Sequence, residues 1–127
     1  MIIGTGVDVV AIPRFERVLR RSPAVALRLF SPEERGLPPR SLAGRFAAKE
    51  AFVKAVGGAP GLRWTDVVVV AEPSGRPVFA LRGPTAEVVA RLGITALHLS
   101  ITHEGGVAVA SVIAEAGSPP ADRPPGT

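Results

Sequence analysis

The sequence contains no cysteine, which excludes disulfide bonds, thiolate nucleophiles and cysteine metal sites. It has no apolar run long enough to cross a bilayer, and Met1 is not followed by a signal peptide. These absences predict a cytoplasmic protein without a membrane partner. Aromatic residues make up only 5% of the chain, so aliphatic side chains are expected to form most of the core.

The chain has 127 residues, a length that predicts one domain. Its last segment, 117–127 (GSPPADRPPGT), is rich in proline, glycine and small polar residues and offers little to bury. We therefore expect a folded domain over residues 1–116 and a flexible tail over 117–127.

Positive charge is in excess, at +4, and arginine supplies all but two of the 15 basic residues. An acidic partner or a phosphate-bearing substrate would suit this balance. Arg14, Arg17 and Arg21 fall within a narrow arc of the first predicted helix, and Arg28 follows on the next helical segment. This cluster is either a solvated basic face or a dock for an acidic helix or phosphates.

Apolar periodicity and turn residues predict an α+β fold with a largely antiparallel sheet packed against a long helix. A β-branched segment at the N-terminus predicts the first strand, and an alanine-rich segment predicts the long helix. Ser31 followed by a proline and by Glu34 has the pattern of a capping box that starts a short helix. Strands are expected over 1–10, 66–72, 77–82, 97–103 and 107–114, and helices over 13–21, 24–30, from 31, over 41–56 and over 85–92.

Asp8 lies inside the apolar first strand, where a carboxylate must pair, take up a proton or bind a cation. Gly4 and Gly6 share its face of the strand, which predicts room for a ligand beside the carboxylate. The alternative is an aspartate at the end of the strand that caps the turn before Pro13.

The helix over 41–56 carries the two lysines of the chain, one on each side of Glu50. Lys49 falls within the apolar stripe and therefore needs an anion nearby, and Arg45 stands one turn before it as a like charge. A compact ammonium suits phosphate, so the two lysines indicate a phosphate site. Glu50 and Lys54 are also spaced as an ordinary solvated ion pair.

His103 continues the inward-facing positions of its strand and emerges beside the turn at Glu104. It is either a site residue or a hydrogen-bonded core histidine. His98 has the opposite parity and is expected to face solvent. No group of residues has the spacing of a zinc site.

Three segments in order, Gly4 to Asp8 (GTGVD), Arg45 to Ala51 (RFAAKEA) and Ser100 to His103 (SITH), resemble the motifs of holo-[acyl-carrier-protein] synthases. These enzymes form the small trimeric class of the 4'-phosphopantetheinyl transferase superfamily. The resemblance implies the fold of that superfamily and transfer of phosphopantetheine from coenzyme A to a serine of an acidic apo acyl carrier protein. It also implies adenosine 3',5'-bisphosphate as the other product and fatty acid biosynthesis as the pathway.

The resemblance also implies a role for each matching residue. Asp8 and Glu50 would hold Mg²⁺, and a homotrimer would place its sites between subunits. The base that deprotonates the serine is open among His103, Glu104 and a metal-bound water oriented by Glu50. The residues that contact coenzyme A would be Arg45, Lys49, Lys54, Gly57, Gly58 and His103. The catalytic residues would be Asp8, Glu50, Lys54, His103 and Glu104. The carrier protein would dock on Arg14, Arg17, Arg21 and Arg28.

The sequence departs from the family pattern at Ala11, where relatives often carry glutamate, and in the loop over 57–65, which contains Ala59-Pro60.

Two other interpretations compete with the resemblance. One is a small basic module that binds an acidic protein or nucleic acid without catalysis, although exposed stacking aromatics and known nucleic-acid motifs are lacking. The other is the same chemistry on a carrier of secondary metabolism, which the short chain makes less favourable.

Overall fold

A computed structural model describes residues 1–117 of the protein. Most of the predicted tail, residues 118–127, therefore lies outside the described residues. The predicted α+β order of a strand, helices, a hairpin, a helix and a second hairpin is confirmed. The elements are β1 Ile2–Ala11, α1 Ile12–Arg21, α2 Ala24–Leu29, α3 Pro32–Arg35, α4 Pro39–Ala55, the 3₁₀ turn η1 Trp64–Asp66, β2 Val67–Ala71, β3 Pro77–Leu81, α5 Gly83–Arg91, β4 Ile94–Glu104 and β5 Val107–Ala116.

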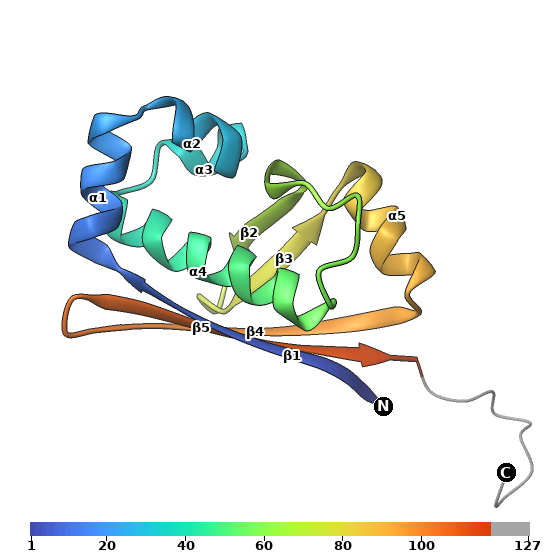
Figure 1. The fold of residues 1–127 in the computed structure, drawn as a ribbon. Helices are drawn as coiled ribbons and strands as arrows, with labels where there is room; N and C mark the ends of the chain where they lie inside the picture. The colour runs from blue at the N-terminus through green and yellow to red at the C-terminus, as the bar shows by residue number, and fades with distance from the viewer. Residues whose placement is uncertain (118–127) are drawn as a thin grey trace, which may run out of the picture.

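The main sheet is antiparallel, with strand order β1-β5-β4, and all the helices lie on one of its faces (Figure 1). Because the helices cover only one face of the sheet, buried and exposed residues alternate along β1. Gly6 and Val10 are buried against the helical layer, whereas Val7 and Val9 point to the open face and are exposed. The outer face of the sheet is therefore left uncovered within one chain.

Helix α4 crosses the inner face of the sheet, and small residues on both surfaces allow it to pack closely. Four alanines of α4 and three of β5 have no exposed surface: Ala43, Ala47, Ala48, Ala51, Ala108, Ala110 and Ala114. The helix begins at Pro39, two residues before the predicted start, because proline is well tolerated at the first helical position. The prediction of a long helix packed against the sheet is confirmed.

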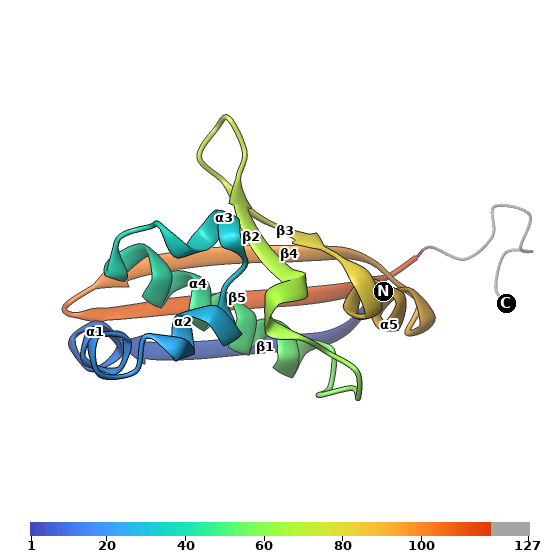
Figure 2. The same cartoon turned by 90° about the horizontal axis from the view of Figure 1, so that it is seen from above.

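The remaining elements lie on the same side of the sheet as α4. Helices α1 to α3 lie toward one end of the molecule and α5 toward the other, and the separate β2-β3 hairpin runs between them (Figure 1). Seen from above, the tip of this hairpin projects beyond the rest of the described chain (Figure 2). Aromatic contacts link the α1 to α3 end to α4, since the rings of Phe15 and Phe46 stack with their centroids 5.2 Å apart.

Over residues 1–117, no helix combines the length and the apolar character that crossing a membrane requires.

Candidate active site

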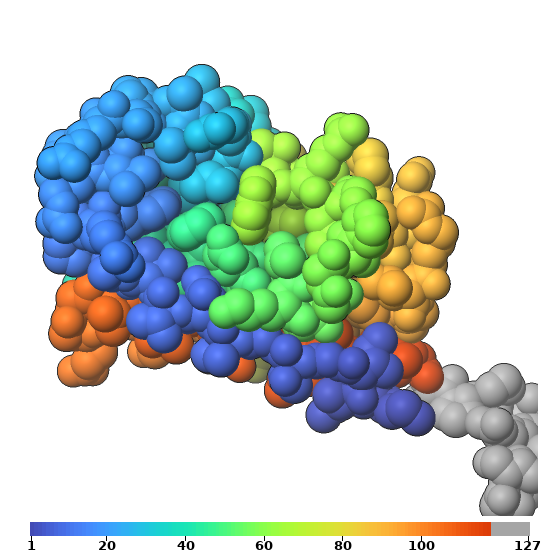
Figure 3. All heavy atoms as spheres, in the orientation of Figure 1, coloured from blue at the N-terminus to red at the C-terminus, as the bar shows by residue number. Residues whose placement is uncertain are grey.

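Asp8 and Glu50 meet at one open pocket of about 440 Å³. Strand β1 supplies Asp8 and α4 supplies Glu50, and Arg14 of α1 lines the same pocket. Burial raises the pKa of Glu50 above its usual range, and the nearby charge of Asp8 raises it further. The structure thus brings together two carboxylates that are distant in sequence. Figure 3 shows the face on which α1, β1 and the C-terminal part of α4 meet.

Gly4 and Gly6 serve the contact between β1 and α4. A Cβ at Gly4 would overlap the carbonyl oxygen of Ala55, and one at Gly6 would overlap that of Ala51. The prediction that these glycines leave room for a ligand is therefore wrong, because the helix backbone fills that space. Their role is to let α4 approach close enough for Glu50 to reach Asp8.

Lys54 joins the end of α4 to β1. Its Nζ donates hydrogen bonds to the backbone oxygen of Val7 at 2.9 Å and to Oδ1 of Asp8 at 3.2 Å. Lys54 therefore pairs with Asp8, and the solvated Glu50–Lys54 pair considered from the sequence is not the pair that forms. The position of Lys54 places a partly exposed cation beside the two carboxylates.

The turn after α4 uses two glycines in the left-handed region. Gly57 and Gly58 have φ angles of 75° and 64°, a conformation that other residues rarely adopt. Gly57 and Lys54 line a hollow of about 300 Å³ beside Gly4. The predicted coenzyme A contacts at this turn thus lie next to Lys54.

Lys49 is fully buried, and its ammonium is occupied by protein groups. It donates to Oε1 of Glu34 at 2.7 Å and to the backbone oxygens of Leu29 and Trp64 at 2.6 and 3.1 Å. The anion that Lys49 requires is therefore a carboxylate of the protein. The predicted phosphate contact of Lys49 does not agree with this geometry, since its three donors are used and it has no exposed surface.

Glu34 was missed as a candidate from the sequence, although the capping box that contains it was predicted. The box is present, with the backbone N–H of Ser31 donating to Oε1 of Glu34 at 3.1 Å. Nothing in the local pattern signals that the same carboxylate also binds Lys49. Its near-complete burial, at 1% exposed, appears only once the chain folds.

Arg45 and His103 lie together on the other flank of α4, at a hollow of about 230 Å³. The ring of His103 rests against Gly44, where a Cβ would come within 2.7 Å of Nε2. Within residues 1–117, neither Arg45 Nε nor His103 Nε2 has a hydrogen-bond partner, and both atoms are buried. The alternative of a hydrogen-bonded core histidine therefore does not describe this Nε2 atom.

Strand β5 separates His103 from Asp8. Ala110 pairs with Asp8 on one side and with Ile101 on the other, which places the β1 and β4 positions two strands apart, about 10 Å. Helix α4 lies over this gap. Within one chain, the candidate residues therefore form two groups, Asp8 with Glu50 and Arg45 with His103, and the structure does not bring these groups together.

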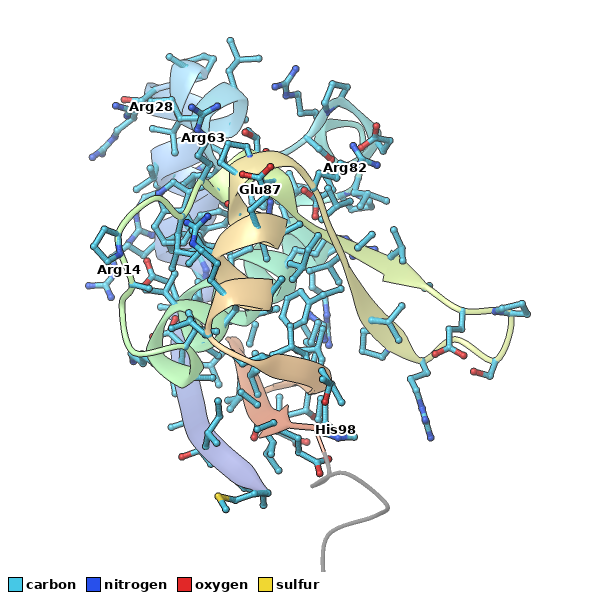
Figure 4. The ribbon with its side chains drawn as sticks, turned by 90° about the vertical axis from the view of Figure 1, so that its right-hand side faces the viewer. Arg14, Arg28, Arg63, Arg82, Glu87 and His98 are labelled. Atoms are coloured by element: carbon cyan, nitrogen blue, oxygen red, sulfur yellow. The ribbon has the colours of Figure 1, made fainter. Side chains whose placement is uncertain are left out.

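The other predicted positions are at the surface. Glu104 is exposed at the end of β4, and His98 is exposed as expected and contacts Glu115. Figure 4 shows Arg14 and Arg28 pointing outward along the same edge of the molecule. Arg17 and Arg21 of α1 are also exposed, so the basic cluster is available to a partner.

A magnesium ion would find two carboxylates here. In the described part of the chain there is no group of three or more His, Cys, Asp and Glu side chains placed to hold a metal. Mg²⁺, however, is commonly held by one or two carboxylates together with substrate phosphates and water. Burial is the first cause of the raised pKa of Glu50 and the negative charge of Asp8 is the second, while Lys54 acts in the opposite direction. A cation bound by both carboxylates would offset the repulsion between them.

Comparisons with known proteins agree with this fold and residue arrangement. Residues 4–110 match the family model described as the 4'-phosphopantetheinyl transferase superfamily. A holo-[acyl-carrier-protein] synthase of Frankia alni is 53% identical over 115 residues, which cover 90% of this chain and 98% of that protein.

Solved structures give the same result. The crystal structure of a holo-[acyl-carrier-protein] synthase from Neisseria meningitidis has a TM-score of 0.84 and 34% identity, covering 91% of this chain and 99% of that one. The Helicobacter pylori enzyme, solved in complex with coenzyme A, has a TM-score of 0.77 and 32% identity, covering 87% of this chain and 99% of that one.

The chain therefore belongs to the 4'-phosphopantetheinyl transferase superfamily and, within it, to the enzymes named holo-[acyl-carrier-protein] synthase. The interpretation as an enzyme is confirmed. The alternative of a basic module without catalysis is set aside.

Proposed function

We propose that this protein transfers the 4'-phosphopantetheine group of coenzyme A to a serine of apo acyl carrier protein in cytoplasmic fatty acid biosynthesis, releasing adenosine 3',5'-bisphosphate. The observation that carries this proposal is the meeting of Asp8 and Glu50 at an open pocket, with Lys54 hydrogen-bonded to Asp8 and Arg14 on the wall. A diphosphate needs cations around it, and Arg14 on the pocket wall, Lys54 beside Asp8 and a divalent ion on the two carboxylates would supply them. The coenzyme A complex of the Helicobacter pylori relative supports the choice of substrate.

Asp8 and Glu50 are the residues that would hold Mg²⁺. When bound there, the ion would offset negative charge on the diphosphate and on the departing bisphosphate. Lys54 keeps the Asp8 carboxylate oriented through the hydrogen bond to Oδ1, and its exposed ammonium is free to approach a phosphate oxygen. The backbone of Gly57 and Gly58 lies at the same end of α4.

The two separate groups of candidate residues favour a site shared between copies of the chain. In a homotrimer, Asp8 and Glu50 of one copy would face Arg45 and His103 of the next, so that one coenzyme A contacts both. The open outer face of the sheet exposes large apolar side chains along β1, and such a surface suits burial against another subunit.

The transfer requires one proton to leave the carrier serine. The serine oxygen forms a new bond to the phosphorus of the phosphopantetheine group. The bond from that phosphorus to the departing bisphosphate breaks, and a base accepts the proton of the serine. Glu50 shares the pocket with Asp8, so a water that Glu50 orients is the candidate base nearest to this pair. His103 would act from the neighbouring copy, and Glu104 remains a third candidate.

The exposed arginines of α1 and α2 are the proposed dock for the carrier protein. Arg14 lies at the pocket itself, which would place a bound acidic helix beside the reacting groups. Complementary charge mainly raises the rate of encounter and the specificity. The docking set is Arg14, Arg17, Arg21 and Arg28.

Mass spectrometry tests the proposal directly. Apo acyl carrier protein incubated with this protein, coenzyme A and Mg²⁺ should gain the mass of one phosphopantetheine group, and a chelator should prevent the gain. An unchanged mass under varied pH, salt and metal conditions contradicts the proposed function. Rates measured on several apo carrier proteins test which carrier is the preferred substrate. Equal rates on all of them would contradict a preference for the fatty acid carrier.

A further inference from the structure

Glu34 is a buried carboxylate at the junction of α3, α4 and β2, and the proposed transfer does not use it directly. Only 1% of the residue is exposed. Its carboxylate accepts hydrogen bonds from Ser31 N at 3.1 Å, Ser31 Oγ at 3.3 Å, Lys49 Nζ at 2.7 Å and Val69 N at 3.1 Å. One side chain thus ties three elements together.

The two oxygens of this carboxylate face different partners. Oε1 binds Lys49 and Ser31, whereas Oε2 accepts from the backbone N–H of Val69 and lies 3.9 Å from Nε of Arg45. The N–H of Val69 belongs to β2, so it fixes the direction of Oε2 relative to α4. The oxygen that faces Arg45 is therefore held by the backbone of another element.

The Nε atom of Arg45 is buried, whereas the rest of the side chain is partly exposed. Its side chain is 20% exposed, and it lines the hollow that also contains His103. Glu34 is the carboxylate paired with Arg45 in the described residues, with its own side chain 2% exposed. Attraction between charges at this separation is much stronger in such a partly buried place than in water.

We propose that Glu34 is a positioning residue for coenzyme A binding, because its Oε2 holds the Arg45 guanidinium toward the hollow beside His103. The role rests on the proposed function, in which Arg45 and His103 contact coenzyme A. Arg45 and Lys49 stand one helical turn apart and repel each other. Burial is the main cause that lowers the pKa of Lys49, the contact with Glu34 raises it, and the charge of Arg45 lowers it further. Glu34 offsets the repulsion between the two cations and keeps Arg45 in place.

The variant Glu34→Gln keeps the size of the side chain and removes its charge. Calorimetric titration with coenzyme A, together with steady-state kinetics, should give an affinity for coenzyme A weaker by about tenfold, while the Michaelis constant for the carrier and kcat change less than twofold. Ser31→Ala is the matched control. It removes one hydrogen bond to Oε1 without touching the charge, so it should lower the melting temperature and leave coenzyme A affinity unchanged.

A double-mutant cycle separates positioning from a structural role. In an Arg45→Gln background, Glu34→Gln should weaken coenzyme A binding no further. If Glu34→Gln alone does not fold, Glu34→Gln with Lys49→Met removes both buried charges together and should show the same loss of affinity.

Three results would overturn the role of Glu34: unchanged coenzyme A affinity in the folded variant, a full additional loss in the Arg45→Gln background, or an equal rise in the Michaelis constant for the carrier. The titration does not depend on catalysis. A wild-type protein that binds coenzyme A without modifying a carrier would contradict the proposed function, and the titration would still test Glu34.

Discussion

Lys54 and Asp8 are joined by a hydrogen bond of 3.2 Å between Nζ and Oδ1, which ties the last turns of α4 to β1. The same lysine also donates to the backbone oxygen of Val7. The Asp8 carboxylate is therefore oriented by a contact from the helix that carries Glu50. This arrangement makes the two carboxylates a unit whose removal should affect the reaction more than the fold.

Replacing either carboxylate should abolish most of the activity. Asp8→Ala or Glu50→Ala is expected to lower kcat/KM at least about a hundredfold, a loss of about 2.7 kcal/mol of transition-state stabilisation. Circular dichroism should show that both variants remain folded. Glu87→Ala, which removes an exposed carboxylate of α5, is the control and should be near wild type. Near-normal rates for the site variants would contradict the proposed metal role.

The stability of the protein should depend on pH through Glu50. Its pKa is raised above 4.5 by burial first and by Asp8 second, so the folded state holds this proton more tightly than the unfolded state does. The folded state therefore loses stability as pH rises through and above the ordinary glutamate range. In a chelating buffer, the melting temperature of Glu50→Gln should exceed that of the wild type at pH 7, and the difference should shrink toward pH 4. A difference that grows on acidification would contradict this assignment.

A methyl group at Gly6 should force β1 and α4 apart, because it would overlap the carbonyl oxygen of Ala51. We expect Gly6→Ala to lower the free energy of unfolding by about 3 kcal/mol and to reduce activity, since Asp8 moves relative to Glu50. Gly36→Ala is the control, because no atom lies within 4 Å of the added carbon. Chemical denaturation measures both variants. Equal stability of Gly6→Ala and wild type would mean that the close approach is not required.

Gly44→Ala should act on His103. The added carbon would lie 2.7 Å from Nε2, so the ring must move away from α4. Alanine also favours the helix by about 1 kcal/mol over glycine, which offsets part of the steric cost. We therefore expect a small change in melting temperature and a several-fold weaker coenzyme A affinity by calorimetry. Wild-type affinity would count against contact between His103 and coenzyme A.

Reversing charge on α1 should affect the carrier more than coenzyme A. Arg14→Glu with Arg21→Glu is expected to raise the Michaelis constant for the carrier and to reduce its dependence on salt. Arg76→Glu with Arg91→Glu makes the same charge change at exposed positions of other elements and should have little effect. If calorimetry instead shows that coenzyme A binding is lost in the first variant, the basic face has been assigned to the wrong substrate.

The sequence predicted the elements well because their local signals are strong. The β-branched, apolar N-terminal segment predicted β1, and the capping box at Ser31 was found as expected. Asp8 was recognised because a carboxylate in an apolar strand is unusual, whereas Glu50 drew attention through its neighbour Lys49 in the apolar stripe and received its metal role only from the resemblance to a family. Their meeting could be inferred only from the resemblance to a family.

The contacts that were not predicted join elements far apart along the chain. The position of Lys49 in the apolar stripe correctly indicated a nearby anion, but the pattern contains no information on whether that anion is a substrate or a carboxylate from α3. Gly4 and Gly6 were correctly placed on the inner face of β1. Alternation alone does not distinguish space for a ligand from space for a helix.

The close passage of α4 over Gly6 has a consequence for how this enzyme tolerates change. The distance between the strand and the helix is limited there by main-chain atoms, which are the same whatever side chains evolve around them. Substitutions elsewhere in the core can therefore alter melting behaviour while the separation of the two acidic groups stays nearly constant. Outside the two glycines of this contact, the residues that set stability are in this sense different from the main-chain atoms that set the catalytic geometry.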